Sequence, residues 1–276
     1  MKYLIVTADD LGLTESINEG IAKACTEGIV TAVSVIPSGE SFEDAIKTIK
    51  DLGLKEIGAH LALTETKPIL SKSRFYRNYS QFFFNLSIGK VKEADIYNEL
   101  KAQLDLVKKI GVTITHINSH EHIHVVPQIL NIFIRLAREY NIPAIRCLRG
   151  DRAPGRFSLK ENYKSILLKY FAGKTKDILN RSNLVFTDFF LGILDSGQLD
   201  INKIQKILTL LKDGVTELVC HPGFLSPEVL SNYPWHIGGE LEIFALTDNR
   251  TKNFIKNSNI QLISYEQFLS LKQNPA

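Results

Sequence analysis

Short apolar runs rich in β-branched residues alternate along this chain with longer stretches in which apolar residues recur every three or four positions. The first pattern predicts buried strands, and the second predicts helices that bury one face. The predicted strands are Tyr3–Ala8, Thr31–Ile36, Glu56–Leu61, Thr113–Asn118, Ala144–Cys147, Leu184–Asp188, Thr216–Cys220 and Gln261–Ser264. This alternation predicts an α/β fold with a parallel sheet and right-handed crossovers.

Residues typical of helix ends delimit the helical stretches. Gly28 follows the first stretch, where a left-handed C-terminal residue is expected, and Pro127 stands where a first helical turn would begin. Eight strands separated by helices are most simply accommodated in a single distorted, TIM-like (β/α) barrel over residues 1–276, with the active site at the C-terminal ends of the strands. An open doubly wound sheet is the alternative.

Two connections are longer than this regular alternation requires. Residues 65–95 contain a basic and aromatic stretch, which we expect to form a lid or insert; a local hydrophobic cluster is the alternative. Residues 148–156 carry Arg149, Arg152 and Arg156 around a proline.

Charge and cysteine content exclude several classes of protein. The 276 residues include 33 Lys plus Arg and 30 Asp plus Glu, so the net charge of +3 does not indicate a nucleic-acid partner. Three widely separated cysteines do not suggest a disulfide scaffold. The first residues lack the apolar region and cleavage site of a secretory signal, and no apolar run approaches the roughly 20 residues of a transmembrane helix, so we expect neither a signal nor membrane association. The cysteine pattern favours a reducing compartment, and we expect a cytoplasmic location.

Acidic, imidazole and guanidinium side chains gather where the predicted strands end. They are Asp9, Asp10, His60, His120, His122, His124, Arg146 and His221. In a parallel barrel the C-terminal strand ends converge on one face, so we expect these side chains to line a common mouth.

Asp9 and Asp10 form an adjacent pair of carboxylates directly after an apolar strand. Burying such a pair is unfavourable unless a cation or a cationic side chain compensates it, and strand alternation would point the two in different directions. The alternative is a polar turn in which Asp10 caps the next helix.

The segment Ser119–His124 carries three histidines at alternate positions beside Glu121. Imidazole and carboxylate groups are common ligands of a divalent metal, and this chemistry alone favours zinc; a surface histidine cluster is the alternative. His116, inside the strand, is expected to be a core residue or one that supports a metal ligand.

Three further residues complete the candidates. His60 lies in a strand that reads as buried and therefore needs a polar partner. His221 precedes Pro222, so it is either an acid–base group or part of a structural turn. Trp235 is a candidate for stacking on a sugar ring, whereas the neighbouring His236 reads as a loop residue.

The ordered motifs A-D-D-L-G-L, G-A-H-L-A-L-T, T-H-I-N-S-H-E-H-I-H and C-H-P-G resemble the YdjC-like carbohydrate deacetylases, which include chitooligosaccharide deacetylases. The resemblance implies a distorted barrel with one divalent metal ion, Mg²⁺ rather than Zn²⁺. Transferred by position, the implied metal ligands are Asp10, His60 and His120. The chain departs from the common family pattern at Leu11, Asn118 and Glu121.

The same resemblance implies roles for the remaining candidates. Asp9 would be the general base, His221 the general acid, and Arg146 would orient or neutralise Asp9. His122 and His124 would contact the substrate or support the metal ligands.

The implied activity is metal-dependent removal of N-acetyl groups from amino sugars or short oligosaccharides. The expected partner is a small acetylated sugar, and a homodimer is possible for this family. Two alternatives stay open: another metallohydrolase, such as a phosphodiesterase with an arginine clamp or a cyclic-amide hydrolase, and an inactive sugar-binding protein.

Overall fold

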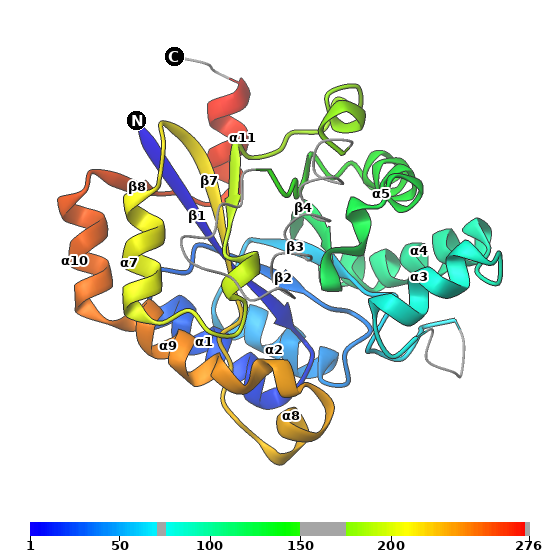
Figure 1. The fold of residues 1–276 in the computed structure, drawn as a ribbon, viewed down its shortest axis with the longest axis horizontal. Helices are drawn as coiled ribbons and strands as arrows, with labels where there is room; N and C mark the ends of the chain where they lie inside the picture. Colours follow the sequence, from blue (N-terminus) through cyan, green and yellow to red (C-terminus); the bar gives the residue numbers. More distant parts are fainter. Residues whose placement is uncertain (71–75, 150–174, 274–276) are drawn as a thin grey trace.

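Parallel strands form the centre of the computed structural model, which describes residues 1–70, 76–149 and 175–273 (Figure 1). The strands are β1 (Lys2–Leu11), β2 (Ala32–Val35), β3 (Glu56–Leu61), β4 (Thr113–Ser119), β5 (Ala144–Ile145), β6 (Phe189–Leu191), β7 (Gly214–Cys220) and β8 (Ile260–Leu262). The sheet order is β5-β4-β3-β2-β1-β7-β6, with β8 paired to β1 outside this path. The predicted parallel α/β sheet is therefore confirmed.

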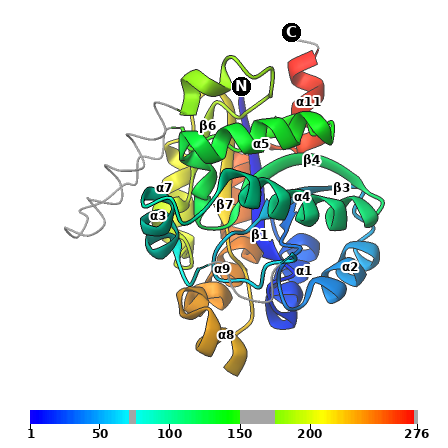
Figure 2. The same cartoon turned by 90° about the vertical axis from the view of Figure 1, so that its right-hand side faces the viewer.

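Helices surround this sheet on several sides (Figure 2). The α-helices are α1 (Glu15–Glu27), α2 (Phe42–Asp51), α3 (Tyr79–Ser87), α4 (Glu93–Lys109), α5 (Pro127–Glu139), α7 (Ile201–Thr209), α8 (Pro227–Asn232), α9 (Gly239–Thr247), α10 (Asn249–Asn257) and α11 (Tyr265–Gln273). Short 3-10 helices are η1 (His120–Val125), η2 (Ile193–Asp195) and η3 (Pro234–Gly238). Among the described residues, none of the helices has the length and apolar character needed to cross a membrane.

The sheet curls, but its strand order departs from a regular eight-stranded barrel. β7 pairs directly with β1, and β8 pairs with the first residues of β1, Lys2–Leu4, whereas β2 pairs with its second half. Val185 forms a parallel bridge with Ala144, which brings the segment before β6 beside β5. The two ends of the strand path thus approach each other, and the fold is a curled parallel sheet.

The sixth predicted strand, Leu184–Asp188, is placed too early. The observed β6 is Phe189–Leu191, which pairs with β7. Val185 contacts β5 through backbone hydrogen bonds to Pro143 and Ile145. The start of this apolar run therefore pairs with β5, and the residues after it pair with β7. Sequence periodicity does not show at which residue a segment stops pairing with one strand and begins to pair with another.

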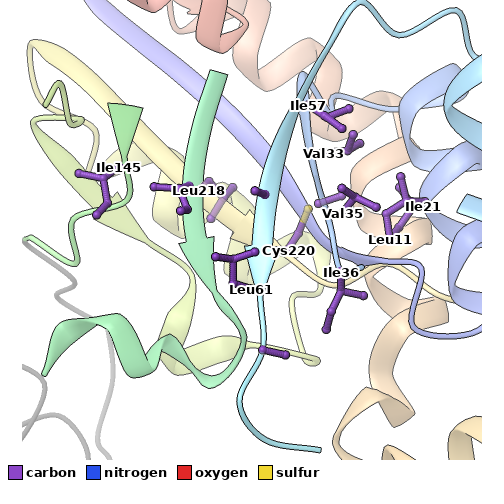
Figure 3. Close-up of a cluster of buried hydrophobic side chains, with 14 of the residues drawn as sticks. Leu11, Ile21, Val33, Val35, Ile36, Ile57, Leu61, Ile145, Leu218 and Cys220 are labelled. Carbon is purple, nitrogen blue, oxygen red and sulfur yellow. The ribbon is translucent and has the colours of Figure 1, made fainter. Parts of the chain in front are cut away.

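Buried side chains fill the space between the sheet and its helices. Figure 3 shows part of this cluster, in which Leu11 of β1 lies with Val33 and Val35 of β2 and Ile21 of α1. The apolar residues that recur at helical spacing are mostly buried: Ile17, Ile21, Ala24, Phe42, Ala45, Ile49, Ile96, Leu100, Leu104 and Val107 are buried, whereas Ile46 is half-buried. Burial of these apolar faces is the main stabilising contribution to the fold.

The two predicted helix-end residues have different outcomes. Pro127 opens α5, as predicted. Gly28 ends α1 in an extended conformation, with φ −112° and ψ −156°, so the predicted left-handed conformation is wrong. A Cβ at Gly28 would overlap the backbone oxygen of Ala24, so the glycine is explained by close backbone approach instead.

The two long connections are only partly described. Residues 65–95 contain α3 and the start of α4, and backbone amides of Ile69 and Leu70 donate to the Glu99 carboxylate of α4. Arg149 is exposed, whereas Arg152 and Arg156 lie outside the described residues.

His116 is a core residue, as predicted, and it requires glycine on the neighbouring strand. Its ring stacks on Tyr265 with 3.7 Å between centroids, and its Nε2 lies 3.1 Å from the Ser34 hydroxyl. Gly58 of β3 lies opposite His116 in the strand register. A Cβ at Gly58 would overlap the imidazole ring.

We therefore expect Gly58→Ala to lower the free energy of unfolding by about 1–3 kcal/mol through overpacking. Urea denaturation would measure the change. In a double-mutant cycle, His116→Ala should remove most of this penalty. Wild-type stability of Gly58→Ala would contradict the proposed steric constraint.

Candidate functional site

A β-bulge near the C-terminal end of β1 sets the directions of Asp9 and Asp10. The register shifts between Ala8 and Leu11, where β1 advances by three residues while β2 advances by two. Asp10 has a left-handed φ of 70°. Bulges of this kind re-aim side chains, and here both carboxylates are fully buried while contacting different partners.

Asp10 faces two histidines from neighbouring strand ends. Its Oδ1 lies 3.0 Å from Nδ1 of His120 and 3.2 Å from Nε2 of His60. Asp10, His60 and His120 are all buried, and one potential ligand atom from each lies within 4.8 Å of the others. Three residues that come from three separate sequence motifs therefore lie together in the structure.

Asn118 orients the His60 ring. The Asn118 amide nitrogen donates to Ser34 Oγ at 3.0 Å and to Asp9 Oδ1 at 3.3 Å, so its oxygen faces Nδ1 of His60 at 2.8 Å. Nδ1 must therefore be the donor in this contact. In a neutral imidazole the lone pair is then on Nε2, the nitrogen that faces Asp10.

Arg146 compensates the charge of Asp9. Its two terminal nitrogens donate to the two Asp9 oxygens, while Nε and Nη2 donate to Glu217 Oε1 at 3.0 and 2.7 Å. All three side chains are fully buried. Glu217 lies inside β7 and was not among the sequence candidates. Nothing in an apolar strand indicates that one of its carboxylates will pair with an arginine far away in the sequence.

The charges in this cluster control the protonation of the carboxylates. Burial would raise the pKa of Asp9, but Arg146 and His60 lower it well below the usual 3.8. Burial opposes ionisation of Asp10 as well, yet the contact with His120 lowers its pKa too. Both side chains are therefore carboxylates at neutral pH.

His120 lies between two carboxylates. Its Nε2 is 2.9 Å from Glu65 Oε2, on the side opposite Asp10. Burial alone would lower the pKa of His120, but Asp10 and Glu65 together raise it well above 6.5. Glu65 was not among the sequence candidates.

His221 follows β7 and is 6% exposed. Its backbone amide donates to the buried Glu242 carboxylate at 2.6 Å, which fixes the chain at this point. The ring Nδ1 has no hydrogen-bond partner among the described residues. Burial lowers the pKa of His221 to about 4, so the imidazole is neutral at neutral pH.

Trp235 lies among the histidines. Its ring centroid is 5.8 Å from that of His120 and 5.4 Å from that of His221, and its Nε1 donates to Glu65. Its place beside the cluster is compatible with the expected contact to substrate.

His236 is a buried part of the cluster, and its interpretation as a simple loop residue is wrong. It is 1% exposed, and its Nε2 lies 3.4 Å from Asp10 Oδ2. The residues before His236 form a proline-containing turn, and nothing in their sequence indicates a contact with Asp10.

His122 and His124 have different surroundings. The half-buried His122 packs edge-on against Phe190, and its Nδ1 has no partner among the described residues. Both nitrogens of His124 face protein oxygens, Ser119 Oγ at 2.6 Å and the Arg146 carbonyl at 3.2 Å. This geometry favours a role for His124 in holding the Arg146 backbone rather than in binding a sugar.

The donor set at Asp10 fits one divalent cation. It combines one carboxylate with two imidazoles, a common arrangement in metalloenzymes. Asp10 Oδ2 is buried without a hydrogen-bond partner among the described residues, and it faces Nε2 of His236 at 3.4 Å.

Several known proteins match nearly the whole length of this chain. A carbohydrate deacetylase of Brevibacillus brevis is 30% identical over 96% of this chain and 98% of its own length. One from Thermoanaerobacter pseudethanolicus is 28% identical with the same coverage. The crystal structure of an Enterococcus faecalis protein, provisionally described as a cellobiose-phosphate cleavage protein, aligns with a TM-score of 0.78, 26% identity and coverage of 97% and 98%.

The family model described as YdjC-like protein matches residues 3–257, which include every strand end discussed above except that of β8. The chain therefore belongs to the YdjC-like protein family.

Proposed function

We propose that the protein is a metal-dependent carbohydrate deacetylase that hydrolyses the N-acetyl group of an amino sugar or short oligosaccharide. The observation that carries this proposal is the buried cluster of Asp10, His60 and His120 directly beside the Asp9–Arg146 pair. The names of the family relatives support the same activity.

Asp10, His60 and His120 would hold one divalent cation. When bound, such an ion supplies Lewis-acid polarisation of the acetamide carbonyl and lowers the pKa of a water. Two imidazole ligands suit zinc, whereas magnesium prefers oxygen ligands; the resemblance to deacetylases favours magnesium. Reconstitution with each ion separately would decide between them.

Asp9 would accept a proton from the attacking water. Arg146 holds both oxygens of this carboxylate in place and keeps it ionised. A positioned general base contributes typically about 10²–10⁴-fold to a rate.

His221 would protonate the departing sugar nitrogen, which is a poor leaving group as an unprotonated amine. Because its imidazole is neutral at neutral pH, His221 must gain this proton during the reaction. The proton that Asp9 takes from the water would pass on to His221 and from there to the sugar nitrogen as the C–N bond breaks, so no other acid is needed.

We propose that the C-terminal strand ends form the mouth of a distorted, TIM-like barrel in a single domain, with residues 65–95 as a lid. Trp235 and His122 would contact the sugar. Tyr79 and Phe84 are exposed aromatic residues of this segment.

Acetate release from a panel of N-acetylated mono- and disaccharides, measured after metal removal and again after adding Mg²⁺ or Zn²⁺, tests the proposed function. We expect activity on at least one acetylated amino sugar that disappears on metal removal and returns with one ion. Turnover of a phosphodiester or cyclic amide, without acetate release, would contradict it in favour of another metallohydrolase.

We expect His120→Ala to abolish stoichiometric metal binding, because it removes one of three protein ligands. In the wild type, metal at 100 times its dissociation constant should stabilise the fold by about 2.7 kcal/mol. Thermal unfolding with and without metal would show this shift in the wild type and not in the variant. His122→Ala is the matched control and should retain the shift; its loss in both would argue against the assigned ligands.

We expect Asp9→Asn to keep metal binding and lose about 10²–10⁴-fold in turnover, because the amide cannot act as the base. Metal content and acetate release are measured on the same sample. The substitution removes one of the two carboxylates that pair with Arg146, so circular dichroism is needed to show that the variant is still folded. Normal turnover would remove Asp9 from the mechanism.

A further inference from the structure

Glu65 has an unfavourable backbone conformation close to the metal-ligand candidates. It follows β3 by four residues and has a left-handed φ of 61°, which is unfavourable for a residue with a long side chain. Strained backbone of this kind persists only where the surrounding structure imposes it, and it often occurs at functional sites.

Hydrogen bonds fix the segment on both sides of Glu65. On one side, the Ala62 amide and carbonyl are both bound by the Gln103 side chain of α4, at 2.9 and 2.7 Å. On the other, Ser38 and Thr66 share a buried hydrogen bond of 2.8 Å. The Glu65 amide itself donates to the carbonyl of Tyr76.

One oxygen of this carboxylate joins two other loops. Glu65 Oε2 accepts from His120 Nε2 at 2.9 Å and from Trp235 Nε1 at 3.1 Å. His120 follows β4, and Trp235 lies in η3 beyond β7. The contact therefore connects the loops that follow three different strands.

We propose that Glu65 is a positioning residue that couples the metal site to the indole of Trp235. By accepting from Nε2, it fixes the His120 ring so that Nδ1 faces Asp10. By accepting from Nε1 with the same oxygen, it sets the orientation of the indole at the mouth. This inference rests on the proposed function, because it assumes that His120 is a metal ligand.

The physical basis is the polarisation of an imidazole. Carboxylates that accept from the second nitrogen of a metal-bound histidine orient the ring and increase its basicity, and their loss typically costs 10–100-fold in metal affinity. A cation bound at Nδ1 replaces the contact of that nitrogen with Asp10 and changes how strongly Nε2 donates to Glu65. The shared Glu65 oxygen then transmits the change to Trp235, so occupancy of the metal site should alter the indole environment.

The chain provides its own reporter for this coupling, because Trp235 is its single tryptophan. Zn²⁺ alone is titrated into the metal-free full-length protein while tryptophan emission is recorded, and calorimetry gives the dissociation constant. Zn²⁺ is chosen because it has no unpaired electrons to quench the indole directly.

Three variants are compared with the wild type. Glu65→Ala removes the acceptor, whereas Glu65→Gln removes the charge and keeps one oxygen. Glu40→Gln is the matched control, since Glu40 pairs with Lys67 near the same segment at 3.0 Å but does not contact the histidines. Urea unfolding of the metal-free variants separates a change at the site from a loss of fold.

We expect zinc affinity to fall 10–100-fold in Glu65→Ala and by an intermediate factor in Glu65→Gln, with the zinc-dependent emission change lost in the first. Glu40→Gln should behave as the wild type. Wild-type affinity or an unchanged emission response in Glu65→Ala would overturn the coupling. If the wild type itself binds no Zn²⁺ or Mg²⁺, the metal site of the proposed function fails instead. If Glu65→Ala does not fold, Glu65→Gln decides: wild-type values there overturn the proposal.

Discussion

The organisation of the site depends on how the protein compensates two adjacent buried carboxylates. Asp9 and Asp10 are both fully buried at the end of β1, where repulsion and lost hydration would otherwise protonate one of them. The bulge in β1 separates their directions. Asp9 then receives the guanidinium of Arg146, and Asp10 receives imidazoles, so each charge has its own compensating group.

This division of partners makes two chemically different halves. On the Asp9 side, the arginine is itself shared with Glu217, which gives a buried ionic group whose members hold one another in one geometry. On the Asp10 side, the neighbouring groups are imidazoles, and those of His60 and His120 are potential metal ligands. In the proposed function, the fixed carboxylate would act as the base beside a cation site that would polarise the acetamide.

Much of the fold was readable from the sequence because secondary structure leaves a local periodic signal. Seven of the eight strands lie at or overlap their predicted ranges, and the apolar residues at helical spacing from Ile17 to Val107 are buried except Ile46, which is half-buried. The sixth strand was misplaced because its apolar run serves two neighbours. The barrel-like curl was expected, but the direct pairing of β7 with β1 was not, since strand order depends on contacts between distant segments.

The sequence by itself determined the parallel α/β class and the polar residues at the strand ends, because apolar periodicity and motif spacing are properties of neighbouring residues. Only the tertiary structure decided which of these residues meet. It added Glu65, Glu217 and His236 to the site and turned His124 toward the Arg146 backbone. These contacts join residues far apart in the chain, and a single carboxylate or imidazole carries no local pattern that would indicate its partner across the sheet.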